Sequence, residues 1–403
     1  MSIFKNKAFI FLLAGCSLSF SIFFIRFILI SWYILEETDS TFLIGLLTGL
    51  PAIFNIFLAP YGGKLADRFS RKHIVFIFRA LSIVIFVSMA LSITYNFNVM
   101  LIILVTSIFM GAFIGLETPA ARLLIADILG KEKIIEGNAT QEFFNQLINA
   151  TLPAIAGFLL TILSITLMFW SLPIIALLSS ICALITLLIF KKNKKDQNLQ
   201  SSDDSSIRDA IRYSYKNIQI RCLLICSLSM LGWAVTQPLI PEFSRDKLGL
   251  EGSGYAILSS VYFLGSMISS ISLQYVKKYI LNSKSILLFI VLYGFSVILF
   301  FISPNFYVAG IMILLSGLFH AYWWAGVLLS LQIIPDERFK GRVISFFFST
   351  VGLVGIGFIV GGFLGTKFSS FIVVISSTSL LFIIHFGLYL FSSSFRSLNS
   401  YKG

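Results

Sequence analysis

Two acids in this sequence lie in strongly apolar surroundings, where a carboxylate can take up and release a proton. Glu117 lies near the end of one apolar run, and Glu142 lies near the start of the next. Carboxylates that approach one another in a medium of low dielectric favour the neutral form, which suits a proton carrier. An ion pair with Arg122 or with the nearby basic residues is the alternative, and the sequence leaves both open.

Other apolar runs carry aromatic rings together with a few polar groups. This combination suits a large, partly apolar ligand. The candidates for such a binding cavity are Arg26, Trp233, Gln237, His320, Trp323 and Trp324. Two alternatives stay open: Arg26, which we expect about six residues from a helix end, can extend to lipid headgroups, and His320 can be a hydrogen-bonded packing residue.

A third group of residues is the charged stretch 62–72, GGKLADRFSRK, which separates two apolar runs. It contains four cations and one carboxylate, Asp67. Membrane topology explains the cations, because Lys and Arg accumulate on the cytoplasmic side. It does not explain Asp67, which we expect to pair with a cation or to face the N-terminus of a helix.

The elements that position these residues are long apolar runs. The chain has 403 residues, 57% of them hydrophobic, and such a composition needs lipid as its main solvent. The first run passes Cys16, continues to about Tyr33 and is long enough to span a bilayer, so it is not a short signal sequence. We predict twelve spanning helices, near 8–33, 42–62, 74–94, 98–120, 139–163, 167–190, 219–241, 254–276, 285–303, 306–331, 342–365 and 370–392.

The basic residues orient these helices. With both termini in the cytoplasm, 25 of the 30 Lys and Arg fall in cytoplasmic segments and 3 in external ones. Topology therefore accounts for the net charge of +12, and no nucleic-acid partner is needed. We predict a six-helix half over 1–190, a cytoplasmic linker over 191–217 whose end forms a short amphipathic helix, and a second six-helix half over 218–403.

The charged stretch also resembles the signature of a known family. Gly63-x-Leu65-Ala66-Asp67-Arg68-x-x-Arg71-Lys72 is similar to the loop 2–3 motif of the major facilitator superfamily, with Ser70 where the family usually has glycine. The resemblance implies an all-α polytopic membrane protein with twelve transmembrane helices in two six-helix halves. It also implies a conformational switch whose residues are Gly63, Asp67, Arg68, Arg71, Lys72, Asp127, Gly341 and Arg342.

In that family the residue matching Asp67 faces the start of helix 11, expected here near Gly341, where a missing side chain permits close approach. The residue matching Arg71 pairs with an acid at the end of helix 4, for which Asp127 is the candidate. In that fold, helices 1, 4, 7 and 10 line the central cavity.

Two further segments narrow the resemblance. Thr118-Pro119-Ala120 and Pro335-Asp336-Glu337-x-x-x-Gly341-Arg342-Val343 are similar to the branch of macrolide efflux proteins and enterobactin exporters. This implies secondary active export of an amphipathic small molecule, such as a drug or siderophore, by alternating access and proton antiport. The alternative is an importer of a small metabolite, or a lysophospholipid flippase, of the same fold.

Two departures bear on proton coupling. The helix 4 arginine of proton-coupled members would fall near Met110, where the sequence has none, and the helix 5 antiporter motif keeps only Pro153 and Gly157. If coupling is present, Glu117 or Glu142 is the candidate proton site.

No nucleophile elbow, HExxH motif or P-loop is present in the sequence, so we expect no enzyme and no ATP-driven pump. We expect no cofactor and no metal. The expected partners are a small-molecule substrate, a coupling ion and the lipid bilayer. We expect a monomer in a bacterial plasma or inner membrane.

Overall fold

The computed structural model describes residues 3–130, 133–190 and 207–398. Over these residues the regular elements are all helices, and twelve helical segments are long and apolar enough to cross a membrane. They run in order from Lys7–Thr38 to Ser370–Phe391 and match the twelve predicted spans. The predicted fold class, an all-α polytopic membrane protein, is therefore confirmed.

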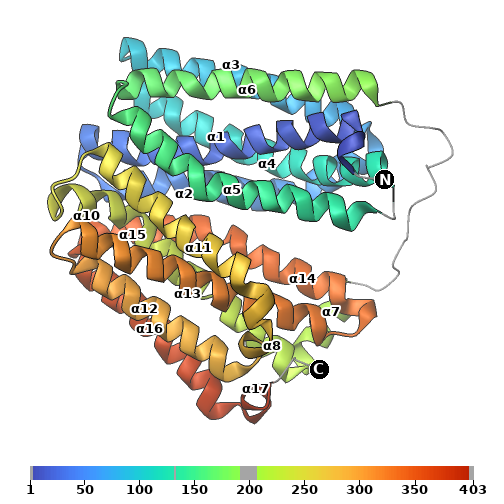
Figure 1. The fold of residues 1–403 in the computed structure, drawn as a ribbon, viewed down its shortest axis with the longest axis vertical. Coiled ribbons are helices and arrows are strands. Elements are labelled where there is room, and N and C mark those ends of the chain that lie inside the picture. The colour runs from blue at the N-terminus through green and yellow to red at the C-terminus, as the bar shows by residue number, and fades with distance from the viewer. Residues whose placement is uncertain (1–2, 131–132, 191–206, 399–403) are drawn as a thin grey trace. The chain divides into compact units, whose positions relative to one another are not determined.

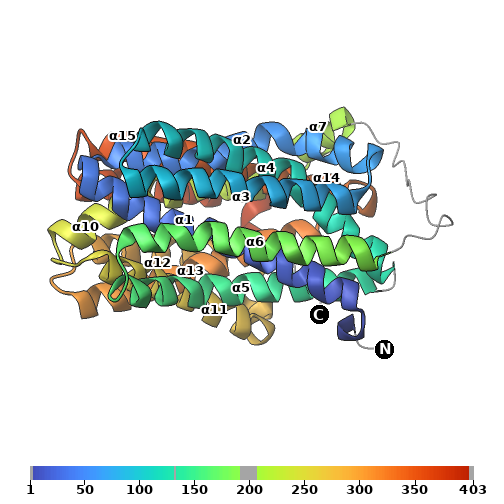
Figure 2. The ribbon, with the colours of Figure 1, turned by 90° about the horizontal axis from the view of Figure 1, so that it is seen from above.

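The first compact unit contains residues 1–39 and 46–200. In it α3 packs along α6, and α6 also packs along α1 (Figure 1). The second view likewise shows α3 and α6 side by side (Figure 2). Its helices are the short η1 Ile3–Lys5, α1 Lys7–Thr38, α2 Thr41–Arg68, α3 Arg71–Tyr95, α4 Val99–Leu129, α5 Ile134–Leu160 and α6 Ile165–Ile189.

The second compact unit contains residues 201–403 together with 40–45, the first turn of α2. Thr41 holds that turn against α15 by donating a 3.0 Å hydrogen bond from Oγ1 to the Gly362 carbonyl. Within the unit, α13 packs against both α11 and α12. Its elements are α7 Ile207–Lys216, α8 Ile218–Ser227, α9 Met230–Thr236, η4 Gln237–Leu239, α10 Ile240–Asp246, α11 Gly252–Ile280, α12 Ser283–Phe301, α13 Phe306–Ile333, α14 Glu337–Gly352, α15 Val354–Gly365, α16 Ser370–Phe391 and α17 Ser393–Arg396.

Small polar residues set where many of these helices begin. At each of these starts, the side chain of an Asn or Ser accepts a hydrogen bond from the backbone N–H three residues later, which satisfies one of the free donors at a helix N-terminus. These capping residues are Asn6, Ser164, Asn217, Asn282, Asn305 and Ser392.

Two of the predicted spans are broken helices. The span Ile218–Asp246 consists of α8, α9, η4 and α10 in succession. Pro238 and Pro241 lie in its second part, and a proline removes a backbone donor and crowds the preceding turn, so the α-helical pattern is interrupted there. The span Arg338–Gly365 is interrupted at Leu353, between α14 and α15.

The charged stretch 62–72, which we place between the spans 42–62 and 74–94, is helical except for two residues. Helix α2 continues to Arg68 and α3 begins at Arg71, so only two residues connect them. A helix does not need to end where its apolar run ends, and cations in its last turn interact favourably with the helix dipole. Gly62 does permit close packing, because a Cβ there would lie 2.2 Å from the Gly115 carbonyl oxygen of α4.

The linker that we predict over 191–217 is described only from residue 207, and its first part lies outside the described residues. The short helix expected at its end is present as α7. The Tyr213 ring stacks on Phe339 with 4.4 Å between ring centroids, and its hydroxyl accepts a 3.0 Å hydrogen bond from the Asp336 backbone N–H. Partial burial raises the pKa of the Tyr213 phenol. The functional division into two halves around this linker stays a prediction.

Candidate functional site

A cluster of aromatic rings surrounds His320 in the second unit. The Trp233 ring lies parallel to the His320 ring, with 5.7 Å between centroids and 8° between planes. Tyr262 Oη and His320 Nδ1 share a 2.8 Å hydrogen bond, and His320 is only 8% exposed. The rings of Tyr293 and Trp323 lie 5.5 Å and 5.3 Å from that of His320. His320 is therefore a hydrogen-bonded member of an aromatic cluster.

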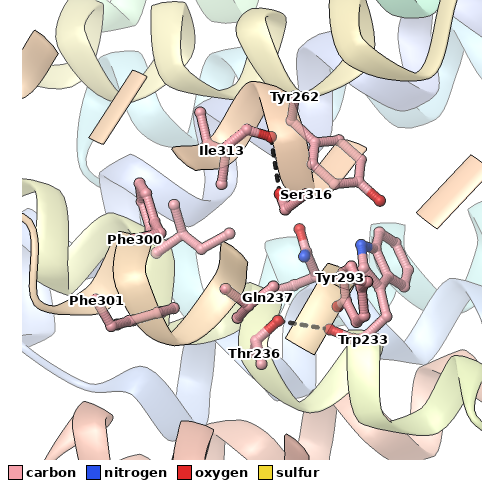
Figure 3. Close-up of a pocket in the computed structure, with 11 residues that line it drawn as sticks. Trp233, Thr236, Gln237, Tyr262, Tyr293, Phe300, Phe301, Ile313 and Ser316 are labelled. Atoms are coloured by element: carbon pink, nitrogen blue, oxygen red, sulfur yellow. Dashed lines mark hydrogen bonds between the residues drawn. The ribbon is translucent and has the colours of Figure 1, made fainter. Parts of the chain in front are cut away.

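A small cavity lies beside this cluster (Figure 3). Its volume is about 10 Å³, which is close to the space that one water molecule needs. Gln237 and Ser316 contribute polar groups, and the Phe300 and Phe301 rings close the apolar part. The full lining is Trp233, Thr236, Gln237, Ile240, Tyr262, Tyr293, Val297, Phe300, Phe301, Ile313 and Ser316.

The predicted cavity residues of this unit divide into two groups. Trp233 and Gln237 line the cavity. His320 and Trp323 are buried and are not among its lining residues, and Trp324 packs on Phe347 with 4.2 Å between ring centroids. Sequence reasoning missed Tyr262 and Tyr293, which come from α11 and α12. A tyrosine in an otherwise apolar span is a usable signal, because its hydroxyl needs a partner when it is buried.

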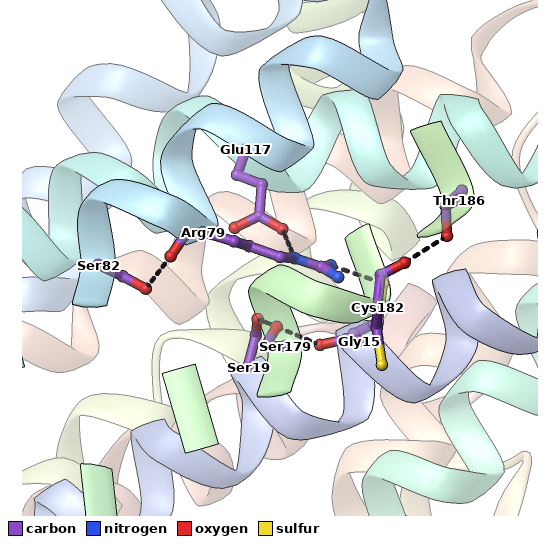
Figure 4. Close-up of polar contacts among 9 residues, drawn as sticks. Gly15, Ser19, Arg79, Ser82, Glu117, Ser179, Cys182 and Thr186 are labelled. Atoms are coloured by element: carbon purple, nitrogen blue, oxygen red, sulfur yellow. Dashed lines mark hydrogen bonds and ion pairs between the residues drawn. The ribbon is translucent and has the colours of Figure 1, made fainter. Parts of the chain in front are cut away.

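In the first unit, a buried ion pair joins α3 to α4 (Figure 4). Arg79 Nε donates to Glu117 Oε1 at 2.7 Å, and Arg79 Nη2 donates to the Cys16 sulfur at 3.2 Å. The Arg79 side chain is 2% exposed and that of Glu117 15%. Sequence reasoning gave Arg79 no role and therefore missed this pair.

A glycine makes room for this ion pair. A Cβ on Gly15 of α1 would lie 2.1 Å from Arg79 Nη1 and 3.1 Å from the Cβ of Cys182. No side chain fits that distance without displacing the guanidinium. Gly15 therefore leaves room on α1 for the end of the guanidinium, whose Nε pairs with Glu117.

Glu117 has an ion-pair partner that we did not predict. We expected the two carboxylates to meet or, as the alternative, an ion pair with Arg122 or the basic loop. The observed partner is Arg79, whose guanidinium compensates the charge of Glu117. Glu142 is exposed. A role of either acid in proton coupling stays a prediction.

Arg26 faces α4 inside the first unit rather than extending toward a helix end. It precedes the end of α1 at Thr38 by twelve residues, or roughly 18 Å at about 1.5 Å per residue, because the helix continues beyond Tyr33. Its side chain is buried, with 2% exposure. Arg26 Nη2 donates to the Ser107 hydroxyl of α4, and Arg26 Nε has no hydrogen-bond partner among the described residues.

Three residues of the predicted switch make defined contacts. Arg71 Nη1 lies 2.8 Å from Asp127 Oδ1, so the pair that the resemblance implied is present, and Arg71 Nε also donates to the Ala66 carbonyl at 3.3 Å. Lys72 Nζ donates to the Leu187 and Phe190 carbonyls at 3.1 Å and 2.8 Å. Lys72 thus satisfies free carbonyls at the C-terminus of α6.

The other switch residues lie in α2 and α14. Asp67 and Arg68 are exposed in the last turn of α2, and a Cβ on Gly63 would have no neighbour within 4 Å. α14 begins at Glu337, four residues before Gly341, and a Cβ on Gly341 would also meet nothing within 4 Å. The close approach expected at Gly341 stays a prediction. Arg342 is the next residue of α14. That Asp67 faces the start of this helix stays a prediction.

Twelve apolar helices in two compact units, with ion pairs inside the spans, are typical of membrane transport proteins. The model of the Major Facilitator Superfamily matches residues 11–350, and the chain belongs to this family. The chain is therefore a transporter rather than an enzyme, and proteins of this family carry small molecules across membranes.

Solved transporters have the same fold at low sequence identity. An inward-facing, unoccupied bacterial homolog of the human lysosomal transporter Spinster gives a TM-score of 0.78 at 15% identity, with 98% of each chain covered. The nucleoside transporter NupG gives 0.70 at 15% identity, covering 96% of this chain and 99% of its own. The xylose transporter XylE from E. coli gives 0.68 at 12% identity, covering 97% and 96%. None of the curated proteins matches this chain in sequence.

Proposed function

We propose that this protein is a secondary active exporter of amphipathic small molecules that works by alternating access. The observation that carries this proposal is the mixed lining beside the His320 cluster. Broad aromatic surfaces from Trp233 and Tyr262 lie next to the amide of Gln237 and the hydroxyl of Ser316. Rings with a few polar groups bind molecules that are partly apolar. In the conformation described here the cavity admits about one water, so a substrate would enter after the lining residues separate.

We further propose that export is driven by proton antiport and that Glu117 carries the proton. Neutralising Glu117 would remove the partner of Arg79, a buried cation that also touches Cys16 of α1. An ion pair that breaks on proton uptake gives the bundle two charge states, as a gradient-driven cycle needs. Glu142 is the second candidate, and its exposure gives it a different environment from that of Glu117.

The similarity of Thr118-Pro119-Ala120 and of 335–343 to the macrolide and enterobactin exporter branch supports drugs or siderophores as substrates. We place the protein in a bacterial plasma or inner membrane as a monomer with both termini cytoplasmic. The basic residues support this orientation, because cytoplasmic Lys and Arg outnumber external ones 25 to 3.

Transport into inverted membrane vesicles tests the proposal. Vesicles with an acidic interior are given a panel of siderophores, macrolides and lysolipids, and accumulation is compared with vesicles lacking the protein. We expect at least one compound to accumulate and the accumulation to collapse with the proton gradient. Accumulation only in right-side-out vesicles would favour the importer instead, and lipid transfer between leaflets would favour the flippase.

The proton site is tested separately. Glu117→Gln should abolish gradient-driven accumulation and keep substrate counterflow, which needs no net proton movement. Glu142→Gln is the matched carboxylate-to-amide control. Loss of accumulation in Glu142→Gln with normal activity in Glu117→Gln would assign the proton to Glu142, and normal accumulation in both and in the double variant would exclude both acids.

A further inference from the structure

The first unit contains two buried arginines inside membrane spans, and their environments differ. Arg79 and Arg26 are each 2% exposed. Arg79 has a carboxylate at 2.7 Å. Among the described residues, the neutral Ser107 hydroxyl is the one hydrogen-bond partner of Arg26, and no ion pair includes it.

An arginine in this position is costly without a negative charge. Transfer of a cation from water into an apolar interior is strongly unfavourable unless the charge is paired, and intramembrane ionisable residues therefore serve a function by default. Arg26 does not reduce this cost by extending to the surface, because its side chain is buried and donates to Ser107 of α4.

The surroundings of Arg26 hold its guanidinium in place without neutralising it. Ser107 Oγ accepts from Arg26 Nη2 and lies 3.0 Å from the Leu47 carbonyl and 2.7 Å from the Ile103 carbonyl, to which it can donate. The serine thus fixes the guanidinium on α1 relative to α4 and α2. Arg26 Nε is buried without a partner among the described residues, so at least one donor of the guanidinium is unused.

We infer that Arg26 binds the anionic group of the transported molecule, and that the substrates of this protein carry a carboxylate, sulfonate or phosphate. A guanidinium suits such groups, because its N–H donors lie in one plane and match the oxygens of an oxyanion. The bound anion supplies the negative charge that Arg26 lacks among the described residues. This inference deepens the proposed function and rests on it for the direction of transport, but not for the binding itself.

Binding of two fluorescent probes that differ by one charge tests the inference. The probes are 11-(dansylamino)undecanoic acid and its carboxamide, which share the aromatic group and the apolar chain. Binding to the purified full-length protein is followed at pH 8 by energy transfer from the tryptophans to the dansyl group. We expect wild-type protein to bind the acid at least about tenfold more tightly than the amide, as a charge-assisted hydrogen bond implies.

The variants then assign this preference to one residue. Arg26→Gln should bind the acid and the amide within about twofold of each other, with the affinity for the amide unchanged, and Arg26→Lys should keep part of the preference because it keeps the charge. Lys64→Gln is the matched control: it removes an exposed cation of the same unit and should keep the full preference. Thermal unfolding shows that each variant is folded, and Arg26→Gln should be at least as stable as wild type, since an uncompensated charge is removed.

Several results would overturn the inference: no saturable binding of the acid, equal binding of both probes by wild type, or a preference that persists in Arg26→Gln. These results are distinct from failure of the proposed function. Selective anion binding without gradient-driven accumulation would contradict the proposed export and support the anion site. Gradient-driven accumulation of neutral compounds only would support export and contradict the anion site.

Discussion

Arg79 and Glu117 form an ion pair across α3 and α4, with 2.7 Å between Nε and Oε1, although 38 positions separate them in the sequence. The pair is enclosed by α1 through Gly15 and Cys16. A buried pair of this kind contributes little net stability, but removal of one partner leaves an uncompensated charge. Its sensitivity to single substitutions is therefore the property to test.

Arg79→Gln is expected to destabilise the protein by about 3–5 kcal/mol, because Glu117 loses its compensating charge in a largely buried site. Thermal unfolding of the purified protein measures the effect. The double variant Arg79→Gln with Glu117→Gln should recover most of the loss, since neither charge then remains. Equal stability of wild type and Arg79→Gln would contradict the importance of the pair.

Gly15→Ala in α1 should disturb the ion pair between Arg79 and Glu117. The added methyl would lie 2.1 Å from Arg79 Nη1, so the guanidinium must move away from Glu117. We expect a measurable fall in melting temperature and impaired transport. Gly387→Ala in α16 is the control, because a Cβ there meets nothing within 4 Å and should be tolerated. Identical behaviour of both variants would show that the space at Gly15 is unimportant.

Tyr262→Phe removes the hydroxyl that shares a 2.8 Å hydrogen bond with His320 Nδ1 and keeps the ring. A buried ring nitrogen left without this partner should lower stability by about 1–3 kcal/mol, which chemical or thermal unfolding can detect. Tyr275→Phe on the same helix is the control, since that side chain is 75% exposed. A similar small effect in both would mean that the Tyr262 hydroxyl is dispensable.

Asp67→Asn is expected to reduce transport severalfold while leaving expression and melting temperature close to wild type. The carboxylate is exposed in the last turn of α2, so it contributes little to folding, and its expected role is to bias a conformational equilibrium. Asp67→Glu keeps the charge and should retain most of the activity. A well-expressed Asp67→Asn protein that transports at the normal rate would exclude this role.

Topology is tested by cysteine labelling in intact cells. Ser202→Cys, in the linker outside the described residues, should be protected from a membrane-impermeant reagent, and Ser40→Cys, between α1 and α2, should react. We expect this pattern because Lys and Arg are in excess in the segments that we assign to the cytoplasm. Reaction at residue 202 with none at residue 40 would reverse the orientation.

The sequence was sufficient to predict twelve spanning helices, because the length of an apolar run is a local property and the bilayer sets the required length. The family could also be inferred from residues 63–72. The ends were less predictable: α2 continues through the charged residues to Arg68, since a helix can extend beyond its apolar part into polar surroundings.

Only the tertiary structure decided which polar groups meet. Glu117 has Arg79 as its partner rather than Glu142 or Arg122, Arg26 is buried beside Ser107, and Tyr262 joins His320. These contacts depend on how each helix is rotated about its axis. In a membrane span both the lipid-facing side and the packed side are apolar, so the sequence pattern contains little information about that rotation. The rotation is fixed by close packing at positions such as Gly15 and Gly62, where the absence of a side chain brings two helices together.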